Sequence, residues 1–306
     1  MRGIATMRGI DRRTALLGLL AVGITGCAAA PRGPQSSTPG PSEALHHTPH
    51  PTAHAAPLPP PPHYVPDPDA VAERFIGAVP TAWGMDLPGI TTQLAASTDA
   101  SLGPRIALTF DACGGRGGSD IDHKLIDGLR ATRTPATLFL NARWIEANAA
   151  LAAELAADPL FLLGNHGTRH VPLSVIGASA YGIPGTASVA EAVAEVWGNH
   201  VVLTELVGTP PTLFRAGTAH YDDVAVQIVH DLGETPVGFS VNGDGGATYS
   251  ADVVRSEFGR VADRGIILAH MNQPQGSTAE GALPAVASLR VHGFHFMHVV
   301  EPVSEA

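Results

Sequence analysis

The sequence has little of several features that would narrow its function at once. It holds only two cysteines among 306 residues, so at most one disulfide can form, and we expect the two thiols to have separate roles. Aromatic residues make up 5% of the chain, and no stretch carries a run of lysine or arginine. With a formal net charge of -10, this composition argues against nucleic acid as a partner and mildly disfavours a strongly anionic polymer substrate.

The first 27 residues lack an apolar run long enough for a comfortable membrane-spanning helix. They combine basic residues, the short apolar stretch Ala15–Ile24 and small residues before Cys27, which is typical of an export signal. The last four of them, ITGC, resemble a bacterial lipobox, in which the cysteine is lipidated. We therefore predict a lipoprotein-type signal peptide over 1–27 and a lipid anchor on Cys27 at the outer face of the cell membrane. A plain secretory signal with an incidental cysteine is the alternative.

Large apolar residues are scarce in the following segment, residues 28–70. This segment holds 13 of the chain's 26 prolines and five of its 15 histidines. Such a composition cannot bury enough apolar surface to fold. We predict a disordered, proline-rich linker over 28–70, which separates the anchor from a folded domain over 71–306.

From residue 105 onward, short apolar runs alternate with amphipathic segments. The runs are near-continuously apolar, as expected of parallel strands covered on both faces, and the segments between them have helical spacing. This alternation is typical of an open doubly wound sheet or a barrel, and we predict a distorted (β/α)7 barrel. The predicted strands are 105–110, 136–141, 160–164, 212–216, 237–241, 266–270 and 294–300. The predicted helices are 121–130, 144–158, 188–206, 222–233, 251–265 and 283–293.

Polar side chains suited to catalysis follow the predicted strands where each strand ends. The carboxyl ends of the strands of such a barrel form one rim, where active sites are built. His166 and His170 are four residues apart, a spacing that on a helical turn aims both imidazoles at one point. Two imidazoles with a carboxylate and an open position make a hydrolytic zinc site. The residues predicted to meet at this rim are Asp111, His166, His170, Arg215, Asp244 and His270.

Five segments of the chain resemble, in the same order, the five motifs of the polysaccharide deacetylase (NodB-homology) family. They are LTFDACGG, GNHGTRH, FRAGTAHYDD, FSVNGDGG and IILAHMN, and the resemblance covers residues 105–300. It implies a distorted (β/α)7 barrel, a divalent metal that is often zinc, and removal of N- or O-acetyl groups from sugar polymers.

The resemblance also implies a role for each matching residue. It makes His166 and His170 metal ligands, and it brings Leu268 near the acetyl methyl group. It makes Asp111 the catalytic base, Arg215 the residue that orients this base, Asp244 the acidic residue of the fourth motif and His270 the general acid. Structural alternatives stay open, since Asp111 could cap a helix, Arg215 could pair with Asp222 or Asp223, and Asp244 stands in an ordinary turn sequence.

One position departs from the family pattern. The family follows its catalytic base with a second aspartate, the third metal ligand, whereas this chain has Ala112, which cannot bind a metal. We expect Asp111 to be the third ligand, with Cys113 as the rival, because thiolate binds zinc well. Other candidates are Asp120, Asp122 and His220. If Asp111 is a ligand, another group such as Asp244 must act as the base.

These features together predict a metal-dependent carbohydrate deacetylase, with Zn²⁺ as the expected metal and an acetylated polysaccharide of the cell envelope as substrate. Two alternatives remain. The first is a lipoprotein that binds glycan without turnover, which the missing second aspartate favours. The second is a hydrolase that uses Cys113 as its nucleophile together with a histidine. The sequence leaves the identity of the glycan and the oligomeric state open.

Overall fold

The computed structural model describes residues 65–96 and 103–299. The predicted signal peptide, Cys27 and most of the predicted linker lie outside these residues. Helix α1 (Pro68–Arg74) begins shortly before the predicted start of the domain at residue 71, and the carboxylate of Asp67 caps it. Within the described ranges, no helix combines the length and apolar character needed to cross a bilayer.

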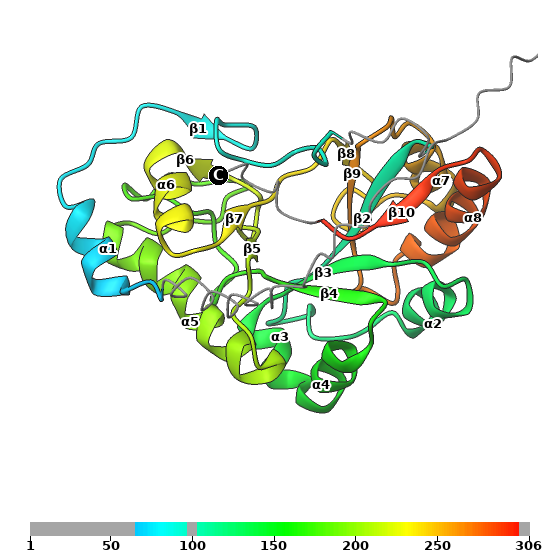
Figure 1. Ribbon diagram of the computed structural model, residues 1–306, viewed down its shortest axis with the longest axis horizontal. Coiled ribbons are helices and arrows are strands. Elements are labelled where there is room, and N and C mark those ends of the chain that lie inside the picture. Colours follow the sequence, from blue (N-terminus) through cyan, green and yellow to red (C-terminus); the bar gives the residue numbers. More distant parts are fainter. Residues whose placement is uncertain (1–64, 97–102, 300–306) are drawn as a thin grey trace, which may run out of the picture. The chain divides into compact units, whose positions relative to one another are not determined.

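A curled parallel sheet forms the centre of the described domain (Figure 1). Among the described residues, seven strands follow one another in the order β7-β5-β4-β3-β2-β9-β8, and β10 pairs with β2 beside this path. The predicted distorted (β/α)7 barrel is therefore confirmed. The strands are β2 (Arg105–Ala112), β3 (Ala136–Leu140), β4 (Phe161–Asn165), β5 (Leu213–Phe214), β7 (Thr235–Pro236), β8 (Val241–Asn242), β9 (Ile266–His270) and β10 (His295–Met297).

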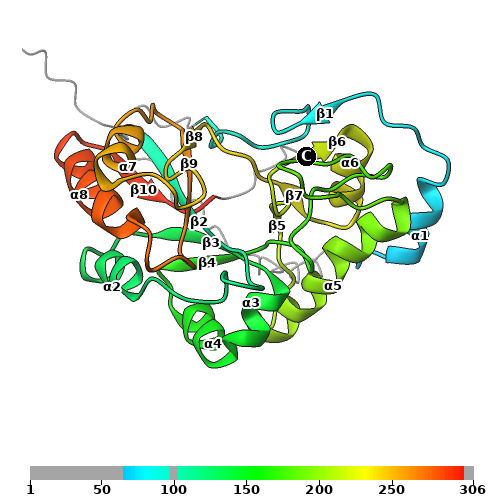
Figure 2. The same cartoon turned by 180° about the vertical axis from the view of Figure 1, so that it is seen from behind.

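Helices cover the outside of this sheet, as both views show (Figures 1 and 2). The predicted helix over 144–158 is divided at Asn148, whose side chain donates to the carbonyls of Ser119 and Trp144. The helix predicted over 251–265 ends earlier, at Phe258. The helices are α2 (His123–Ala131), α3 (Ala142–Ala147), α4 (Ala149–Ala157), α5 (Val189–Val207), α6 (Asp223–Asp231), α7 (Ala251–Phe258) and α8 (Thr278–Val291).

The barrel is open between β7 and β8, the two ends of the strand path. The sequence predicted one strand over 237–241, but β7, which pairs with β5, ends at Pro236, and β8, which pairs with β9, begins only at Val241. The segment before the barrel lies against this opening. Its Thr91 N–H donates to the carbonyl of Pro236 at 2.8 Å, and its Leu94 N–H donates to the carbonyl of Arg264 at 2.8 Å. A second, two-stranded sheet pairs β1 (Trp83–Gly84) of this segment with β6 (Tyr221–Asp222).

The central strand β2 has two faces of different character. Successive side chains of a strand point to opposite faces. Ile106, Leu108, Phe110 and Ala112 belong to the main hydrophobic cluster, which also includes residues of α2, α4, α7 and α8. The alternate residues 107, 109 and 111 face the interior of the barrel, where Ala107 packs in a smaller apolar cluster and the last two are polar. Apolar packing outside the barrel therefore leaves the inner face of β2 free to carry Asp111.

Replacing Phe110 by alanine tests this division. Phe110 is fully buried in the main cluster. We expect Phe110→Ala to lower the free energy of unfolding by about 3–5 kcal/mol, because the removed ring leaves a cavity that the strand cannot close. Val291→Ala, at a side chain that is 85% exposed, should change it by less than about 0.5 kcal/mol. Urea unfolding followed by circular dichroism measures both; equal stability of the two variants would contradict this assignment of the core.

Candidate active site

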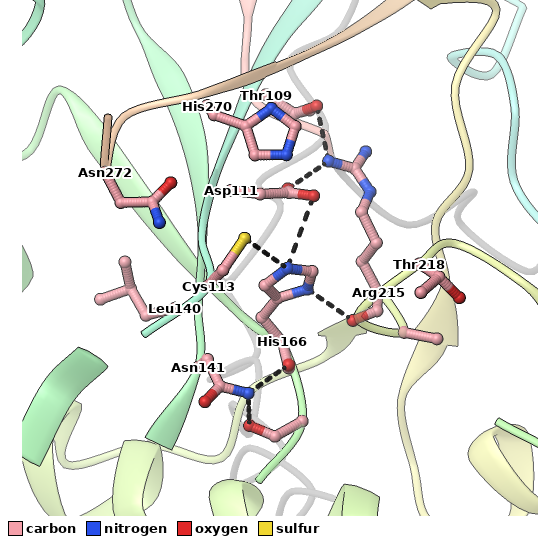
Figure 3. Close-up of polar contacts among 12 residues, drawn as sticks. Thr109, Asp111, Cys113, Leu140, Asn141, His166, Arg215, Thr218, His270 and Asn272 are labelled. Atoms are coloured by element: carbon pink, nitrogen blue, oxygen red, sulfur yellow. Dashed lines mark hydrogen bonds and ion pairs between the residues drawn. The ribbon is translucent and has the colours of Figure 1, made fainter. Parts of the chain in front are cut away.

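The predicted site residues come together at the carboxyl ends of the parallel strands, and Figure 3 shows four of them, Asp111, His166, Arg215 and His270. Asp111 and His270 are paired residues at the ends of the neighbouring strands β2 and β9. His166 directly follows β4, Arg215 directly follows β5, and Asp244 lies two residues after β8. Strand ends that are far apart in sequence are adjacent in the sheet, so these side chains share one rim.

A buried ion pair between Arg215 and Asp111 forms the floor of the site (Figure 3). Nη1 of Arg215 donates to Oδ1 of Asp111 at 2.7 Å and to the Thr109 hydroxyl at 2.8 Å. Its Nε and Nη2 donate to the carbonyls of Val237 and Gly238, in the stretch between β7 and β8. Burial alone would raise the pKa of Asp111, but the charge of Arg215 together with those of His166 and His270 and the Arg215 hydrogen bond outweighs it and holds this pKa below its usual value. Asp111 is therefore an ionised carboxylate whose Oδ2 faces the site.

The imidazole of His166 presents one nitrogen to the site. Its Nδ1 lies 2.8 Å from the carbonyl oxygen of Arg215, and because a carbonyl can only accept, Nδ1 carries the proton. Nε2 then points toward Oδ2 of Asp111 at 3.6 Å and Sγ of Cys113 at 4.0 Å. The ring of His170 stands edge-on to that of His166, with centroids 4.9 Å apart. The two imidazoles thus meet, as the spacing predicted.

The segment that carries the two histidines is a loop, whereas the sequence predicted a helical turn. His170 has a φ of 62°, in the left-handed region. Glu195 on α5 holds this loop: its carboxylate accepts from the backbone N–H groups of Thr168, Arg169 and His170 at 2.9–3.1 Å. Three donated hydrogen bonds to one buried carboxylate place His170, and Glu195 is therefore a positioning residue. Sequence reasoning missed it; the available signal was an acidic residue on the buried face of α5, beside Ala192 and Val196.

Cys113 lies beside the two histidines. Its Sγ and one ring nitrogen each of His166 and His170 all lie within 4.8 Å of one another. Among the described residues, these three side chains are the group that could hold a metal ion, and Asp111, predicted as the third ligand, is outside it. The thiolate of Cys113 is favoured, since hydrogen bonds from the nearby histidines outweigh burial and bring its pKa well below the usual value. A Cys–His–His donor set suits zinc.

The other candidate ligands have different partners. Asp122 caps α2 by accepting from the N–H of Leu125 at 3.0 Å. The ring of His220 is close to those of Trp83 and Tyr181, and its Nδ1 lies 2.8 Å from the carbonyl oxygen of Thr218. Asp120 is exposed. None of the three belongs to the donor group found among the described residues.

His270 is held by Asp244. The Oδ1 of Asp244 accepts from Nδ1 of His270 at 2.9 Å, and its Oδ2 accepts from the backbone N–H of His270 at 2.7 Å and from the Thr278 hydroxyl at 2.9 Å. Burial would lower the pKa of His270, but the charge and hydrogen bond of Asp244, together with the nearby Cys113, outweigh it and raise this pKa well above the usual value. Asp244 is buried and fully engaged, so it positions His270 and has no free oxygen with which to act as a base.

A cavity of about 430 Å³ opens over these groups. Asp111, His170 and His270 line it together with Leu268, the predicted apolar wall. Its other lining residues include Met85, Tyr181, Phe239 and Tyr249. The N–H of Gly114, in the turn after Cys113, donates to the carbonyl of Gly118 at 2.9 Å and is therefore not available to stabilise an oxyanion. The cavity therefore offers an ionised carboxylate, a protonated imidazole and an apolar wall to one bound group.

A second buried polar network, which the sequence did not indicate, lies behind the histidine loop. Asn165, the last residue of β4, accepts from the N–H of Gly167 and donates to Oε1 of Glu234 at 2.9 Å. The same Oε1 lies 2.8 Å from Nδ1 of His200. Oε2 of Glu234 is buried and has no hydrogen-bond partner in the described part of the chain. Burial of this carboxyl raises its pKa to about 7.

Three comparisons place this architecture among known proteins. Residues 99–237 match the family model described as polysaccharide deacetylase. No curated protein matches the sequence. Eight similar solved structures are 17–22% identical to this chain, so they show the fold alone.

Three solved structures illustrate the likeness. A pseudoenzyme of carbohydrate esterase family 4 (CE4) from Bacillus anthracis is 20% identical, with 64% of each chain covered and a TM-score of 0.54. This chain thus spans slightly less than two thirds of that protein. A family 4 carbohydrate esterase from Bacillus subtilis is 17% identical, with 76% of this chain and 86% of that chain covered and a TM-score of 0.54. A family 4 acetyl xylan esterase from Clostridium thermocellum, solved with a cobalt ion, is 19% identical, with 63% of this chain and 87% of that chain covered and a TM-score of 0.52.

Glu234 should make stability depend on pH. Its pKa rises from 4.5, the ordinary value, to about 7 on folding, so the folded state favours the protonated carboxyl. The stability that this group contributes is complete below pH 4.5 and is lost as pH rises through about 7. The side chain of Glu234→Gln stays neutral at every pH. We therefore expect its free energy of unfolding to rise relative to that of the native chain by on the order of 2 kcal/mol as the pH goes from 5 to 8. Urea unfolding at several pH values measures this, with the exposed Glu146→Gln as the control; parallel pH profiles for native chain and Glu234→Gln would contradict it.

Proposed function

We propose that this protein is a metal-dependent hydrolase that removes acetyl groups from a carbohydrate polymer, because residues 99–237 match the polysaccharide deacetylase family model. The observation that carries the proposal is the meeting of three kinds of group around one cavity, which His170 of the metal-donor group lines together with Asp111 and His270. These are a metal-binding donor group, the ionised carboxylate of Asp111 and the protonated imidazole of His270. Metal-assisted hydrolysis of an acetamide or acetate ester uses all three.

The donor set fits a divalent metal such as zinc. Because Nδ1–H of His166 is donated to a carbonyl, Nε2 is its ring nitrogen that can ligate an ion, and a ring nitrogen of His170 and the Cys113 Sγ lie close by. His166, His170 and a third donor would hold the ion. A divalent cation bound there supplies Lewis acidity toward the acetyl carbonyl and the attacking water.

Asp111 accepts the proton of the attacking water in this proposal. Its Oδ1 is occupied by Arg215, which keeps the carboxylate ionised and oriented, and its Oδ2 faces the site. This arrangement suits a general base better than a metal ligand, because the ion pair fixes the carboxylate at hydrogen-bonding distance from Arg215.

His270 donates a proton from Nε2 to the leaving amine or alcohol. Asp244 holds Nδ1–H, so that Nε2 is the nitrogen available to the cavity. Leu268 lies in the cavity wall, where an acetyl methyl group can pack away from water.

We also propose that the protein is exported and anchored to the outer face of the cell membrane through lipidated Cys27. The support is the sequence of residues 1–27, with its basic start, its short apolar stretch and its lipobox-like end. An acetylated polysaccharide of the cell envelope is then the substrate within reach.

Two other candidate functions have one observation each in their favour. Ala112, in place of the family's second aspartate, favours glycan binding without turnover, and a CE4 pseudoenzyme is among the proteins of similar fold. The distance of 4.0 Å between Cys113 Sγ and Nε2 of His166 favours a thiol hydrolase.

Acetate release from N-acetylglucosamine oligomers, peptidoglycan and acetylated xylan separates these functions. We expect release that a chelator abolishes and zinc restores. Glycan binding with no release from any polymer would instead indicate the binding protein. Release that resists the chelator and is lost in Cys113→Ser would indicate the thiol hydrolase.

Asp111→Asn tests the general base. The amide keeps the shape of the side chain but cannot accept the proton of water, and we expect kcat to fall by about 10²–10⁴-fold with a small change in KM. The control is Asp252→Asn, whose side chain is 92% exposed on α7. Steady-state acetate release measures both variants, and an Asp111→Asn enzyme with native kcat would exclude the role.

Asp244→Asn tests the general acid through its positioning residue. The native kcat/KM should fall at alkaline pH as His270 loses its proton, and Asp244 delays this loss because its charge favours the imidazolium. Removing that charge should move the alkaline limb of the pH profile to lower pH, while Asp111 and Cys113 still face His270. The profile of kcat/KM is the measurement, with Asp252→Asn again as control. An alkaline limb at the native pH in Asp244→Asn would contradict the assignment.

A further inference from the structure

We propose that Cys113 supplies the third protein ligand of the metal site as a thiolate, which makes the centre a Cys–His–His site and leaves Asp111 free as the base. This inference rests on the proposed function for the presence of a metal, and it assigns a ligand at a position where the family pattern has no counterpart. The metal-donor group of Cys113, His166 and His170, found within the described residues, is its starting point.

The alternation of β2 explains why Cys113, and not its neighbour, reaches the site. Asp111 faces the interior of the barrel, and Ala112 faces outward into the main hydrophobic cluster, where it is fully buried. Cys113 follows two residues after Asp111 and returns to the same face. A donor at position 112 would have to leave the apolar cluster, whereas Sγ of Cys113 already lies 4.0 Å from Nε2 of His166.

The backbone after Cys113 holds the thiol in place. Gly114 and Gly115 have φ values of 67° and 77°, and a Cβ atom on Gly114 would lie 2.5 Å from the backbone nitrogen of Trp144. Only glycine fits such a close approach in this conformation. On the same side, Arg143 donates from Nη2 to the carbonyl of Cys113 at 3.3 Å. The residue is therefore fixed by the turn that follows it and by the start of α3.

The carboxylate of Asp111 is already paired with Arg215 and is therefore less available to a metal ion than Cys113. Asp111 is tied through Oδ1 to the buried guanidinium of Arg215, which in turn is fixed by Thr109 and two backbone carbonyls. Moving Asp111 onto a metal would weaken a buried pair whose separation is costly. Among the described residues, the polar contacts of the Cys113 side chain are with the histidines of the site, so no ion pair of this kind competes for its sulfur.

A thiolate ligand changes which ions the site prefers. Carboxylate, carbonyl and water ligands suit magnesium and manganese, whereas thiolate favours softer ions such as zinc and cobalt. We therefore expect this centre to bind Zn²⁺ and Co²⁺ tightly and to discriminate strongly against Mg²⁺ and Mn²⁺.

Cobalt spectroscopy tests the assignment independently of catalysis. The full chain carries Cys27→Ser in every sample, so that Cys113 is its one remaining thiol. After removal of metal with a chelator, Co²⁺ is added, and we expect a near-ultraviolet sulfur-to-cobalt charge-transfer band that saturates at a single ion per chain. Cys113→Ser should lose the band and bind cobalt about 10–100-fold more weakly or worse. Circular dichroism of each variant establishes that it is folded.

Two further measurements sharpen the test. Zinc should protect Cys113 from alkylation by iodoacetamide. Alkylation should proceed in the metal-free chain, and it should also proceed when Mg²⁺ is added in place of zinc. His166→Ala should remove both the cobalt band and the protection. His292→Ala, at an exposed histidine near the end of α8, should keep both.

The outcomes separate this inference from the proposed function. Cobalt binding without a charge-transfer band, at an affinity that Cys113→Ser does not alter, would overturn the ligand assignment even if acetate is released. A cobalt band and metal protection without acetate release from any glycan would support the assignment while the deacetylase proposal fails. A chain that binds neither ion, with a reactive Cys113, would overturn both.

Discussion

Both the barrel and its site depend on the hydrogen bonds and the ion pair made by the buried guanidinium of Arg215. It lies where the sheet opens between β7 and β8, and it donates there to the carbonyls of Val237 and Gly238. It also binds Thr109 and Asp111 on β2, and its guanidinium lies 4.2 Å from the centre of the Phe139 ring on β3. Neither charge of the pair could be buried alone, since breaking a buried ion pair leaves an uncompensated charge at a cost of about 3–5 kcal/mol. The interaction that joins the strand ends therefore also keeps the candidate base ionised.

Two buried carboxylates, those of Asp244 and Glu195, position the histidines of the site that Arg215 does not contact. Asp244 binds both the ring and the backbone of His270, and Glu195 binds the loop that carries His170. Asn165 links this loop to Glu234 through Gly167. Most of these partners are backbone N–H groups, so each carboxylate fixes the path of the chain and, through it, the direction of an imidazole. Preorganised groups of this kind are what acid–base chemistry in a closed cavity requires.

In our proposal, the end of β2 exchanges an oxygen ligand at position 112 for the thiolate of Cys113 without a change in the geometry of the strand. Ala112 adds to the apolar packing outside the barrel, and the inner face passes from Asp111 to Cys113. An oxygen donor is thereby absent from position 112, and a sulfur donor stands one residue later, where the glycine turn brings it to the histidines. This exchange would alter which metal ions the site prefers and would leave the fold unchanged, because a donor set with a thiolate is softer than one with a carboxylate.

The sequence by itself determined the class of the fold and most of the rim. Apolar runs buried on both faces mark parallel strands from their composition alone, so the strand over 266–270 and the residues after each strand could be located without coordinates. Interactions between distant residues could not be read in this way. The break of the predicted strand over 237–241 depends on the approach of Arg215, and the conformation of the loop around His170 depends on Glu195. The separation of Asp111 from the Cys113–His166–His170 group likewise depends on which side chain Arg215 reaches. Tertiary structure decided these points because a buried charge forms hydrogen bonds with whichever chain segments the fold brings within about 3 Å. The local sequence does not show which distant segments these are.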